Sequence, residues 1–307
     1  MLTLLVVSMV IFGIFQIIPG DAVLSRLGLD ADPDLVEAMR QEMRLNDPPL
    51  QRYFSWLVGL IRGDLGNSLR YSVPVSSLIA MRLPVTFTLA ALSFCQVLII
   101  SIPLGLWLAE HNHTTKGRLI SALVQVLLAI PVFAMAIVLM LVFGLWLGLF
   151  PISAAASWEQ GWLSFLSSLI LPSFALSLPS IAITVRYLKS SLQEQSEKDY
   201  VRTARSKGLD QPTIFKKHLL RNALLPVITI LGVILINTLG GSIVIESAFS
   251  VPGIGQLLGT AIRSRDLPLV QGISFYIATI IVLGFLLLDE IYRLVDPRLR
   301  GNGGDLS

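Results

Sequence analysis

The most polar stretch of this 307-residue sequence is the segment 189–226, KSSLQEQSEKDYVRTARSKGLDQPTIFKKHLLRNALLP. We expect a short helix that begins at Asp199 and ends at Gly208, because glycine readily adopts the left-handed conformation that closes a helix. Its apolar face would carry Tyr200, Val201 and Ala204, and its charged rim Arg202, Arg205 and Lys207. Asp210 then predicts a second helix, with Pro212 in its first turn, that runs on into an apolar block. The segment therefore predicts a rigid projection of two helices.

Two roles suit such a projection. A rigid, half-apolar helix could transmit the movement of a partner protein into a membrane. A basic helix could equally rest on lipid headgroups without any partner. The physical properties of the segment leave both alternatives open.

Patterns typical of catalysis are missing from the sequence. It has no phosphate-binding loop, no H-E-x-x-H, no cysteine pair at metal spacing and no G-x-S-x-G. His111 and His113 could form half of a metal site, but we expect them to be solvated loop residues. The single cysteine, Cys95, lies in an apolar block, where we expect core packing rather than chemistry. The sequence thus predicts a non-catalytic chain that holds no cofactor or metal.

The apolar residues are gathered into blocks long enough to cross a membrane. The composition is 54% hydrophobic and only 14% charged, and spans through a hydrocarbon core must be helical. The third block is long and contains Pro131, so we expect it to tilt, kink or lose its ends to the membrane interface. The predicted spans are about 1–19, 84–109, 119–149, 163–188, 223–246 and 267–290. We therefore predict an all-α polytopic membrane protein with about six transmembrane helices.

Ionisable residues are absent from most of these blocks. No Asp, Glu, Lys, Arg or His occurs within 84–109, 119–149, 163–185, 223–245 or 267–288. Ion-coupled secondary transporters usually keep such a residue near the middle of the membrane, so that class remains only a distant alternative. Gly240-Gly241 in the fifth block would either favour a bend or allow close packing with another helix.

The basic residues predict the orientation of the chain. Lys and Arg concentrate in 110–118, in 189–222 and in the tail 291–307, which indicates the cytoplasmic side. Both termini would then be cytoplasmic. The small net charge of +3 is spread over the loops, which favours a membrane surface over nucleic acid as a partner.

The long segment 20–83 is expected to form a small helical extracytoplasmic cap. Asp32-Pro33 and Asp47-Pro48 are typical helix starts. Two apolar stripes follow them: Leu35, Met39 and Met43, then Leu50, Phe54, Leu57 and Ile61. We expect these stripes to pack on each other and on the spans, although a docking surface for an external partner is also compatible with them. The domain order would be the first transmembrane helix 1–19, the cap 20–83, a five-helix transmembrane core 84–290 that includes the polar loop 196–222, and the tail 291–307.

The segment 199–226 resembles the EAA loop of ABC importer permeases. In the general pattern, E-A-A is followed after three residues by Gly and, nine residues later, by I-x-L-P. Arg202-Thr203-Ala204 takes the E-A-A place, Gly208 the glycine, and His218, Leu220 and Arg221 the I, L and P. The departures at Arg202, His218 and Arg221 match the dipeptide/oligopeptide/nickel subfamily, which looks like D-Y-V-x-x-A-R-x-K-G-L followed by H-x-L-R-N-A-L-L-P.

Other parts of the chain look like landmarks of the same family, in the same order. They are Pro19-Gly20-Asp21, Gly63-Asp64-Leu65-Gly66-Asn67-Ser68-Leu69, Ile245-Glu246, Phe249, Pro252-Gly253-Ile254-Gly255, Arg265-Asp266, Pro268, Val270-Gln271-Gly272 and Asp296-Pro297-Arg298-Leu299-Arg300. The resemblance therefore covers essentially the whole chain.

This resemblance implies a type I ABC importer permease fold in a bacterial plasma (inner) membrane, and a set of partners. They are a second homologous permease subunit, two ATP-binding subunits that hold ATP and Mg, an extracytoplasmic solute-binding protein and membrane lipid. The ATPase-coupling interface would be Asp199, Tyr200, Val201, Arg202, Ala204, Arg205, Lys207 and Gly208. The chain would form half of a translocation pathway for di- or oligopeptides. The alternative cargoes within the family are nickel, a metal chelate or glutathione, and the substrate-binding residues are unknown.

Overall fold

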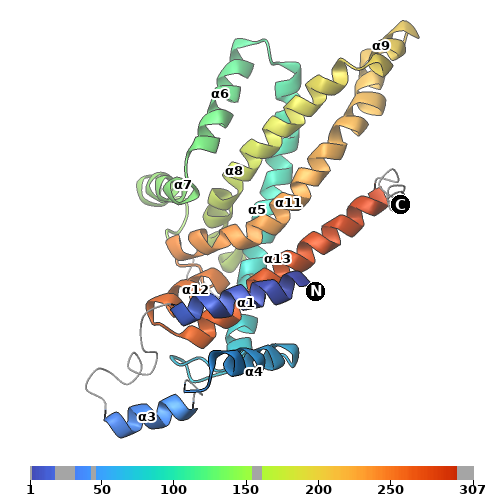
Figure 1. Ribbon diagram of the computed structural model, residues 1–307. Coiled ribbons are helices and arrows are strands. Elements are labelled where there is room, and N and C mark those ends of the chain that lie inside the picture. The colour runs from blue at the N-terminus through green and yellow to red at the C-terminus, as the bar shows by residue number, and fades with distance from the viewer. Residues whose placement is uncertain (1, 18–31, 43–45, 154–160, 296–307) are drawn as a thin grey trace, which may run out of the picture. The chain divides into compact units, whose positions relative to one another are not determined.

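A computed structural model describes residues 2–17, 32–42, 46–153 and 161–295, and every regular element in those ranges is helical (Figure 1). The helices, in order, are α1 (Leu2–Ile17), α3 (Pro33–Glu42), α4 (Pro49–Ile61), α5 (Val75–Glu110), α6 (Thr115–Ala129), α7 (Val132–Leu139), η1 (Met140–Trp146), α8 (Trp162–Ser196), α9 (Asp199–Ser206), α10 (Gln211–Thr213), η3 (Ile214–Leu219), α11 (Leu220–Ala248), α12 (Ile254–Arg263) and α13 (Leu267–Val295). The chain divides into one unit of residues 1–86 and 252–284 and a second of residues 87–251 and 285–307.

Four helical stretches are long and apolar enough to cross a membrane. They are Val75–Glu110, Trp162–Ser196, Gln211–Ala248 and Leu267–Tyr292. A fifth span is possible if the bent pair of α6 with α7 and η1 counts as one. The described part of α1, at 16 residues, is shorter than the roughly 20 residues that usually cross a bilayer. The all-helical membrane fold is confirmed, while the number of six spans stays a prediction.

The kink predicted at Pro131 is confirmed. The helices on either side of it differ in direction by 111°. Ile130 is extended there, as expected for the residue before a proline, and Pro131 itself stands at the N-cap of α7. The third apolar block is therefore broken rather than continuous.

In the second unit, α8 is the central helix. Most of its apolar stretch is buried, and it packs on α6, α7 and α11. Gly105 lets α5 approach α8 closely, since a Cβ there would lie 2.8 Å from Leu188 Cδ2. The hydroxyl of Ser191 donates to the carbonyl of Ala223 at 2.9 Å, which ties α8 to α11. Segments from three helices are thus fixed against one another.

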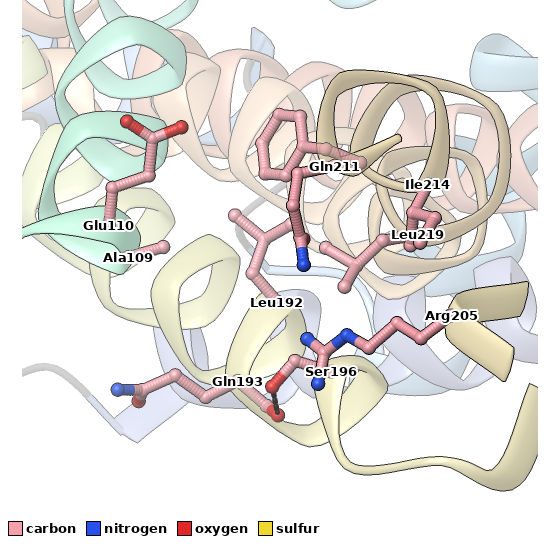
Figure 2. A pocket seen from close by; sticks show the side chains of 10 residues that line it. Ala109, Glu110, Leu192, Gln193, Ser196, Arg205, Gln211, Ile214 and Leu219 are labelled. Atoms are coloured by element: carbon pink, nitrogen blue, oxygen red, sulfur yellow. Dashed lines mark hydrogen bonds between the residues drawn. The ribbon is translucent and has the colours of Figure 1, made fainter. Parts of the chain in front are cut away.

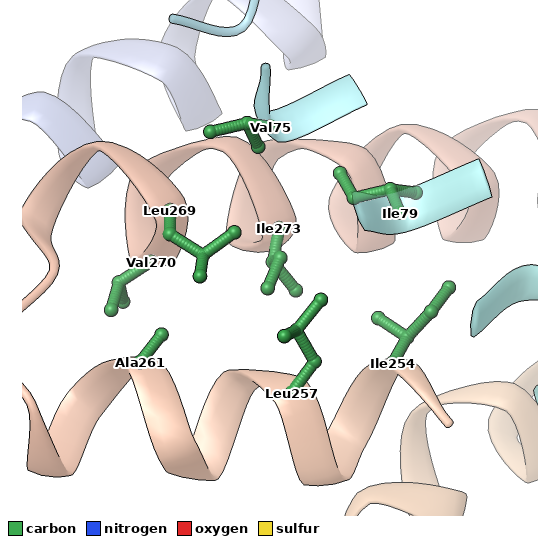
Figure 3. Close-up of a cluster of buried hydrophobic side chains, with 8 residues drawn as sticks. All are labelled: Val75, Ile79, Ile254, Leu257, Ala261, Leu269, Val270 and Ile273. Atoms are coloured by element: carbon green, nitrogen blue, oxygen red, sulfur yellow. The ribbon is translucent and has the colours of Figure 1, made fainter. Parts of the chain in front are cut away.

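The other unit has its own apolar core, drawn in Figure 3. Ile254, Leu257 and Ala261 of α12 face Leu269, Val270 and Ile273 of α13, and the start of α5 adds Val75 and Ile79. Helix α12 was not predicted, because it lies between the predicted spans 223–246 and 267–290. Its apolar residues recur at helical spacing, 254, 257 and 261, and this signal could have revealed it.

A buried carboxylate holds the loop 64–74 in the same unit. Asp266 is 1% exposed, and it accepts hydrogen bonds from the Ser68 hydroxyl and from the amides of Leu69 and Arg70, both at 3.1 Å. It also accepts from the amide of Leu269 at 3.3 Å, as an N-cap residue of α13 would. Two of the segments that resemble family landmarks therefore meet at one carboxylate.

The region predicted as a cap is only partly as expected. The Asp32 carboxylate accepts from the Asp34 amide at 3.0 Å, in keeping with the helix start predicted for α3, but Leu35 of the predicted stripe is exposed, whereas Val36 is buried. Helix α4 begins one residue later than predicted, with Pro48 rather than Asp47 at the N-cap. Met39 and Met43 lie outside the residues whose side chains the structure describes.

Most side chains of the apolar stripe predicted for α4 are exposed, whereas packing within the chain was expected. Leu50, Phe54 and Ile61 are 73%, 60% and 80% exposed, and Tyr53 is the buried residue. The Tyr53 hydroxyl lies 2.9 Å from the Ser8 hydroxyl of α1, and Tyr53 packs edge-on against Phe12. An aromatic face with a polar tip, rather than the aliphatic stripe, therefore joins α4 to α1.

The prediction that Cys95 is packed in the core is wrong. Its thiol belongs to an exposed residue on α5. An apolar block can bury one face within its own chain and leave another for lipid or a neighbouring subunit, and the sequence does not distinguish those two faces.

Candidate functional site

Helix α9 is a separate short helix that follows the end of α8. The chain leaves α8 at Glu197, becomes extended at Lys198 and begins α9 at Asp199. An exposed ion pair joins Lys198 Nζ to Glu194 Oε1 at 3.0 Å across this junction. The Tyr200 hydroxyl donates to Gln195 Oε1 at 2.9 Å. The Tyr200 hydrogen bond links the two sides of the turn between α8 and α9, while the exposed ion pair adds little to its stability.

Gly208 ends α9 as predicted. Its φ of +75° lies in the left-handed region, its amide donates to the Arg205 carbonyl at 3.0 Å, and the next amide, from Leu209, donates to the Ala204 carbonyl at 3.3 Å. This pair of hydrogen bonds is the Schellman arrangement, which satisfies the last carbonyls of a helix. A residue with a Cβ would be strained there, so Gly208 sets the direction in which the chain returns.

The apolar face of α9 is buried within the chain itself. Val201 is 0% exposed and Ala204 is 6% exposed. They join a cluster whose other buried members come from α8, η3 and α11, namely Leu188, Leu192, Ile214, Leu219, Ala223 and Val227. Burial of a valine side chain is worth about 1.5–3 kcal/mol. Val201 and Ala204 therefore fix α9 to the ends of the long helices, and their surfaces are not free for a partner.

The outer face of α9 is charged and open. Asp199, Arg202, Arg205, Lys207 and Gly208 are all exposed, and Tyr200 is half-buried. Arg202 and Asp199 face each other at 3.6 Å with side chains 73% and 95% exposed, and such a pair contributes little to stability. The eight residues expected at an interface thus divide into two that hold the helix and six that remain at least partly accessible.

A cavity of about 190 Å³ lies beside α9 (Figure 2). Its walls come from the end of α5, the end of α8, α9, and the start of the α10–η3 helix. Figure 2 shows the Arg205 side chain extending from α9 toward Ser196 at the end of α8. The lining residues are Ala109, Glu110, Leu192, Gln193, Ser196, Arg205, Gln211, Ile214, Phe215 and Leu219. The edge of α9 that carries Arg205 is therefore less closely packed than the edge that carries Val201.

The chain beyond Gly208 continues directly into a long helix. Asp210 occupies the N-cap position with extended backbone, and its carbonyl accepts from the Ile214 amide at 3.1 Å. Hydrogen bonding from Thr213 in the first turn lowers the pKa of the Asp210 carboxyl. From Gln211 the helical backbone runs without a break through a π-helical stretch, 214–219, into α11. The predicted projection of two helices is present, and its second helix is the beginning of a candidate membrane span.

No group of three or more His, Cys, Asp or Glu side chains positioned to hold a metal ion occurs among the described residues. The ring of His111 instead stacks on Trp107, with centroids 4.5 Å apart. His113 is exposed.

Comparison with known families matches nearly the whole chain. Residues 101–301 match the model of the binding-protein-dependent transport system inner membrane component, and residues 1–90 match the model of its N-terminal part. A putative peptide transport system permease protein of Brucella abortus is 37% identical over 297 residues, which are 97% of this chain and 95% of that protein. These matches include the segment 199–226 that first indicated the resemblance.

Two further relatives have more specific names. The oligopeptide transport system permease protein AppB of Bacillus subtilis is 36% identical, with 96% of this chain and 95% of that protein covered. The glutathione transport system permease protein GsiC of Pectobacterium atrosepticum is 33% identical, with 97% and 95% covered.

The fold also has a counterpart among solved structures. A chain of the MetNI methionine ABC transporter, in an inward-facing conformation, aligns with a TM-score of 0.56 and 18% identity, covering 71% of this chain and 96% of that one. This likeness concerns the fold alone. Taken with the family matches and the apolar helices, it completes the assignment: the chain belongs to the binding-protein-dependent inner-membrane permease family and is a multi-pass permease subunit of an ABC importer.

Proposed function

We propose that this chain forms half of a peptide pathway and that α9 is the part that receives the force of ATP hydrolysis. A second homologous permease would supply the other half, two ATP-binding subunits would bind ATP and Mg, and an extracytoplasmic binding protein would deliver the cargo. In this proposal α9 and both termini lie in the cytoplasm. The basic segments 110–118 and 189–222 support that orientation.

The observation that carries the proposal is the division of α9 into a buried face and a charged face. A helix that only rested on lipid headgroups would turn its apolar face toward the membrane. Here Val201 and Ala204 are instead buried against α8, η3 and α11. The face left over is charged and rigidly held, which suits a protein partner.

The same cluster provides a mechanical connection to the membrane spans. Force on α9 reaches α8 through Leu188 and Leu192 and reaches α11 through Ala223 and Val227. Because packed cores deform little, a displacement of α9 would move the ends of both helices together. Closure of the ATPases would in this way switch the pathway between its outward-facing and inward-facing states.

Within α9, the accessible residues make the proposed contact. Tyr200 and Gly208 would touch the ATPase directly, while Arg202, Arg205 and Lys207 would orient the docking and Asp199 would complete the charged rim. Charges at the edge of an interface affect association rate and specificity more than affinity. Val201 and Ala204 contribute by holding the helix in place.

Copurification of the assembled complex tests the ATPase contact. Arg202→Glu combined with Arg205→Glu should reduce the amount of ATPase retained by the detergent-solubilised permease pair at least about tenfold, since two like-charge contacts replace two favourable ones. Lys216→Glu combined with Lys217→Glu is the matched control, because both lysines are exposed on the neighbouring η3. Equal retention by both double variants would contradict the assignment of α9.

Peptide is the cargo that the names of the relatives favour, and glutathione is the second candidate because one relative carries that name. Nickel or a metal chelate is a third family cargo. Uptake of radiolabelled trialanine, glutathione and nickel by the complete complex in proteoliposomes, with its binding protein supplied outside, separates the three. ATP-dependent uptake of glutathione or of nickel, without uptake of trialanine, would overturn the peptide proposal. Uptake driven by an ion gradient without ATP would indicate a secondary transporter.

A further inference from the structure

Asn237 is a polar residue in the middle of an apolar helix. No Asp, Glu, Lys, Arg or His occurs in the block 223–245. Glu246 is the first ionisable residue after this block. Asn237 lies nine residues before it, a separation of about 14 Å along the helix axis at 1.5 Å per residue. The hydrocarbon core of a bilayer is about 30 Å thick, so the side chain stands close to the middle of the membrane.

The carboxamide of Asn237 is exposed and makes no hydrogen bond within the described part of the chain. The nearby polar residues of α11 differ in this respect. Thr238 is buried and bonds to the Ile234 carbonyl at 2.7 Å, and the exposed Thr229 bonds to the Leu225 carbonyl at 3.3 Å. Their hydroxyls are satisfied by their own helix, whereas the longer amide needs a partner outside it.

Lipid cannot be that partner, because hydrocarbon offers neither a donor nor an acceptor to an amide. Asn237 must therefore face a second protein chain or water. Its neighbours along the helix are suited to lining an open space. Pro226, Val233, Gly240 and Val244 lie along the same side at helical spacing, and each is exposed or only half-buried.

We propose that this side of α11 lines the translocation pathway and that the Asn237 carboxamide hydrogen-bonds the backbone of the passing peptide. A carboxamide suits this cargo because it both donates and accepts, as a peptide group does, and carries no charge that would hold the cargo in place. The inference rests on the proposed transport of peptides for the nature of the cargo. The exposure of Asn237 to water does not depend on it.

Cysteine accessibility tests the position of Asn237. With the native thiol removed by Cys95→Ser, Asn237→Cys and the control Leu235→Cys are introduced separately into the complete transporter. Both native residues are exposed in the isolated chain, Leu235 at 42%, and they point about 200° apart around the helix. A charged, membrane-impermeant methanethiosulfonate reagent, added from either side, should modify position 237 in at least one nucleotide state and leave position 235 unreacted.

The reaction at position 237 should also slow when trialanine and its binding protein are present. Equal reactivity at both positions, or no reaction at 237 in any state, would overturn the proposal. A cysteine at 237 that is never modified but forms a disulfide with a cysteine in the partner permease would assign this side to the subunit interface instead.

Transport kinetics test the hydrogen bond itself. Asn237→Leu, which keeps the branching and the number of side-chain heavy atoms, should lower ATP-dependent uptake of trialanine about tenfold per molecule of complex, the effect of one lost hydrogen bond in a site sheltered from water. Asn237→Gln should restore most of the uptake, and ATPase retention should stay normal in both variants. If wild-type complex takes up no trialanine, the peptide assignment fails while the labelling result still stands. If wild type and Asn237→Leu transport equally well, the proposed contact fails.

Discussion

Two polar regions of this chain use their charges in opposite ways. In the unit that contains α12, the carboxylate of Asp266 is buried and accepts bonds from Ser68, Leu69, Arg70 and Leu269. In the other unit, the charges of α9 are exposed, and its buried residues are the apolar Val201 and Ala204. Both segments resemble the permease family. The Asp266 carboxylate is fully hydrogen-bonded within its own chain, whereas the charged side chains of α9 are free to contact a partner.

This difference distinguishes residues that maintain the fold from residues that offer a surface for contact. A buried carboxylate that accepts several hydrogen bonds favours one loop conformation, because any other conformation leaves the buried donors without an acceptor. An exposed charged face contributes little to folding and gains value only when another protein covers it. The comparison predicts that changes at Asp266 act through stability and that changes on the outer face of α9 act through association.

The largest effect is expected from Val201→Asp. The new carboxylate would replace a fully buried side chain among Leu188, Leu192 and Ile214, where an unpaired charge costs several kcal/mol. We expect α9 to detach and ATP-dependent transport to be lost. Hydrogen–deuterium exchange of the α9 amides in the assembled permease pair measures the detachment directly. The neighbouring change Arg202→Asp is the control, and similar exchange in the two variants would contradict the assignment of the buried face.

A smaller but still large effect is expected from Asp266→Ala. The change removes the acceptor of the Ser68 hydroxyl and of the amides of Leu69 and Arg70, and we expect a loss of about 3 kcal/mol in stability. Thermal unfolding of the detergent-solubilised complex gives the size of the effect. Asp266→Asn keeps one acceptor oxygen and should lose less. A transport defect without any loss of stability would instead mean that Asp266 has a direct role in transport.

An intermediate effect is expected from Gly208→Val. The backbone there has a φ of +75° and no side chain in its way, so the cost is conformational strain of about 1–2 kcal/mol. The return of the chain into α10 would be redirected, and coupling between ATP hydrolysis and uptake should fall while the complex still assembles. The ratio of ATP hydrolysed to trialanine imported is the measurement. Gly63→Val, at a left-handed glycine with a φ of +79° in the other unit, should leave that ratio unchanged.

The smallest effect on folding is expected from Arg202→Ala. Within the described residues, the Arg202 side chain pairs only with Asp199, at 3.6 Å and with 73% of its side chain exposed, so the loss of stability should stay below about 0.5 kcal/mol. The rate of ATPase association should fall, and it should fall most at low salt, where charges are least screened. Association kinetics at two ionic strengths test this prediction. A rate that does not depend on salt in wild type would remove the electrostatic role.

Local sequence signals predicted much of this site. The position of Asp199 at the start of α9, the left-handed Gly208 at its end and the continuation into the next apolar helix follow from short-range rules. The break at Pro131 belongs to the same class. Each of these features depends on the backbone conformations that a few neighbouring residues can adopt, and those residues can be read directly from the sequence.

Burial was much harder to predict. The stripe of Leu50, Phe54 and Ile61 is exposed where packing was expected, and Cys95 is exposed where a core was expected. A membrane protein is apolar both where it packs and where it meets lipid or a partner, so hydrophobicity cannot distinguish these faces. The role of Val201 and Ala204 changed for the same reason, since their apolar character suited a partner's surface as well as their own chain.

By itself, then, the sequence determined the class of the protein: blocks without charge must be membrane helices, and a landmark pattern along the whole chain identified the importer family. Only the tertiary structure decided which side chains are buried and which polar groups find a hydrogen-bond partner. It buried Val201 in a cluster drawn from three other elements, placed Ser68 against Asp266 across 198 residues of sequence, and left the Asn237 amide without a partner in the described chain. Contacts between residues so far apart depend on how the helices pack, and no local pattern encodes them.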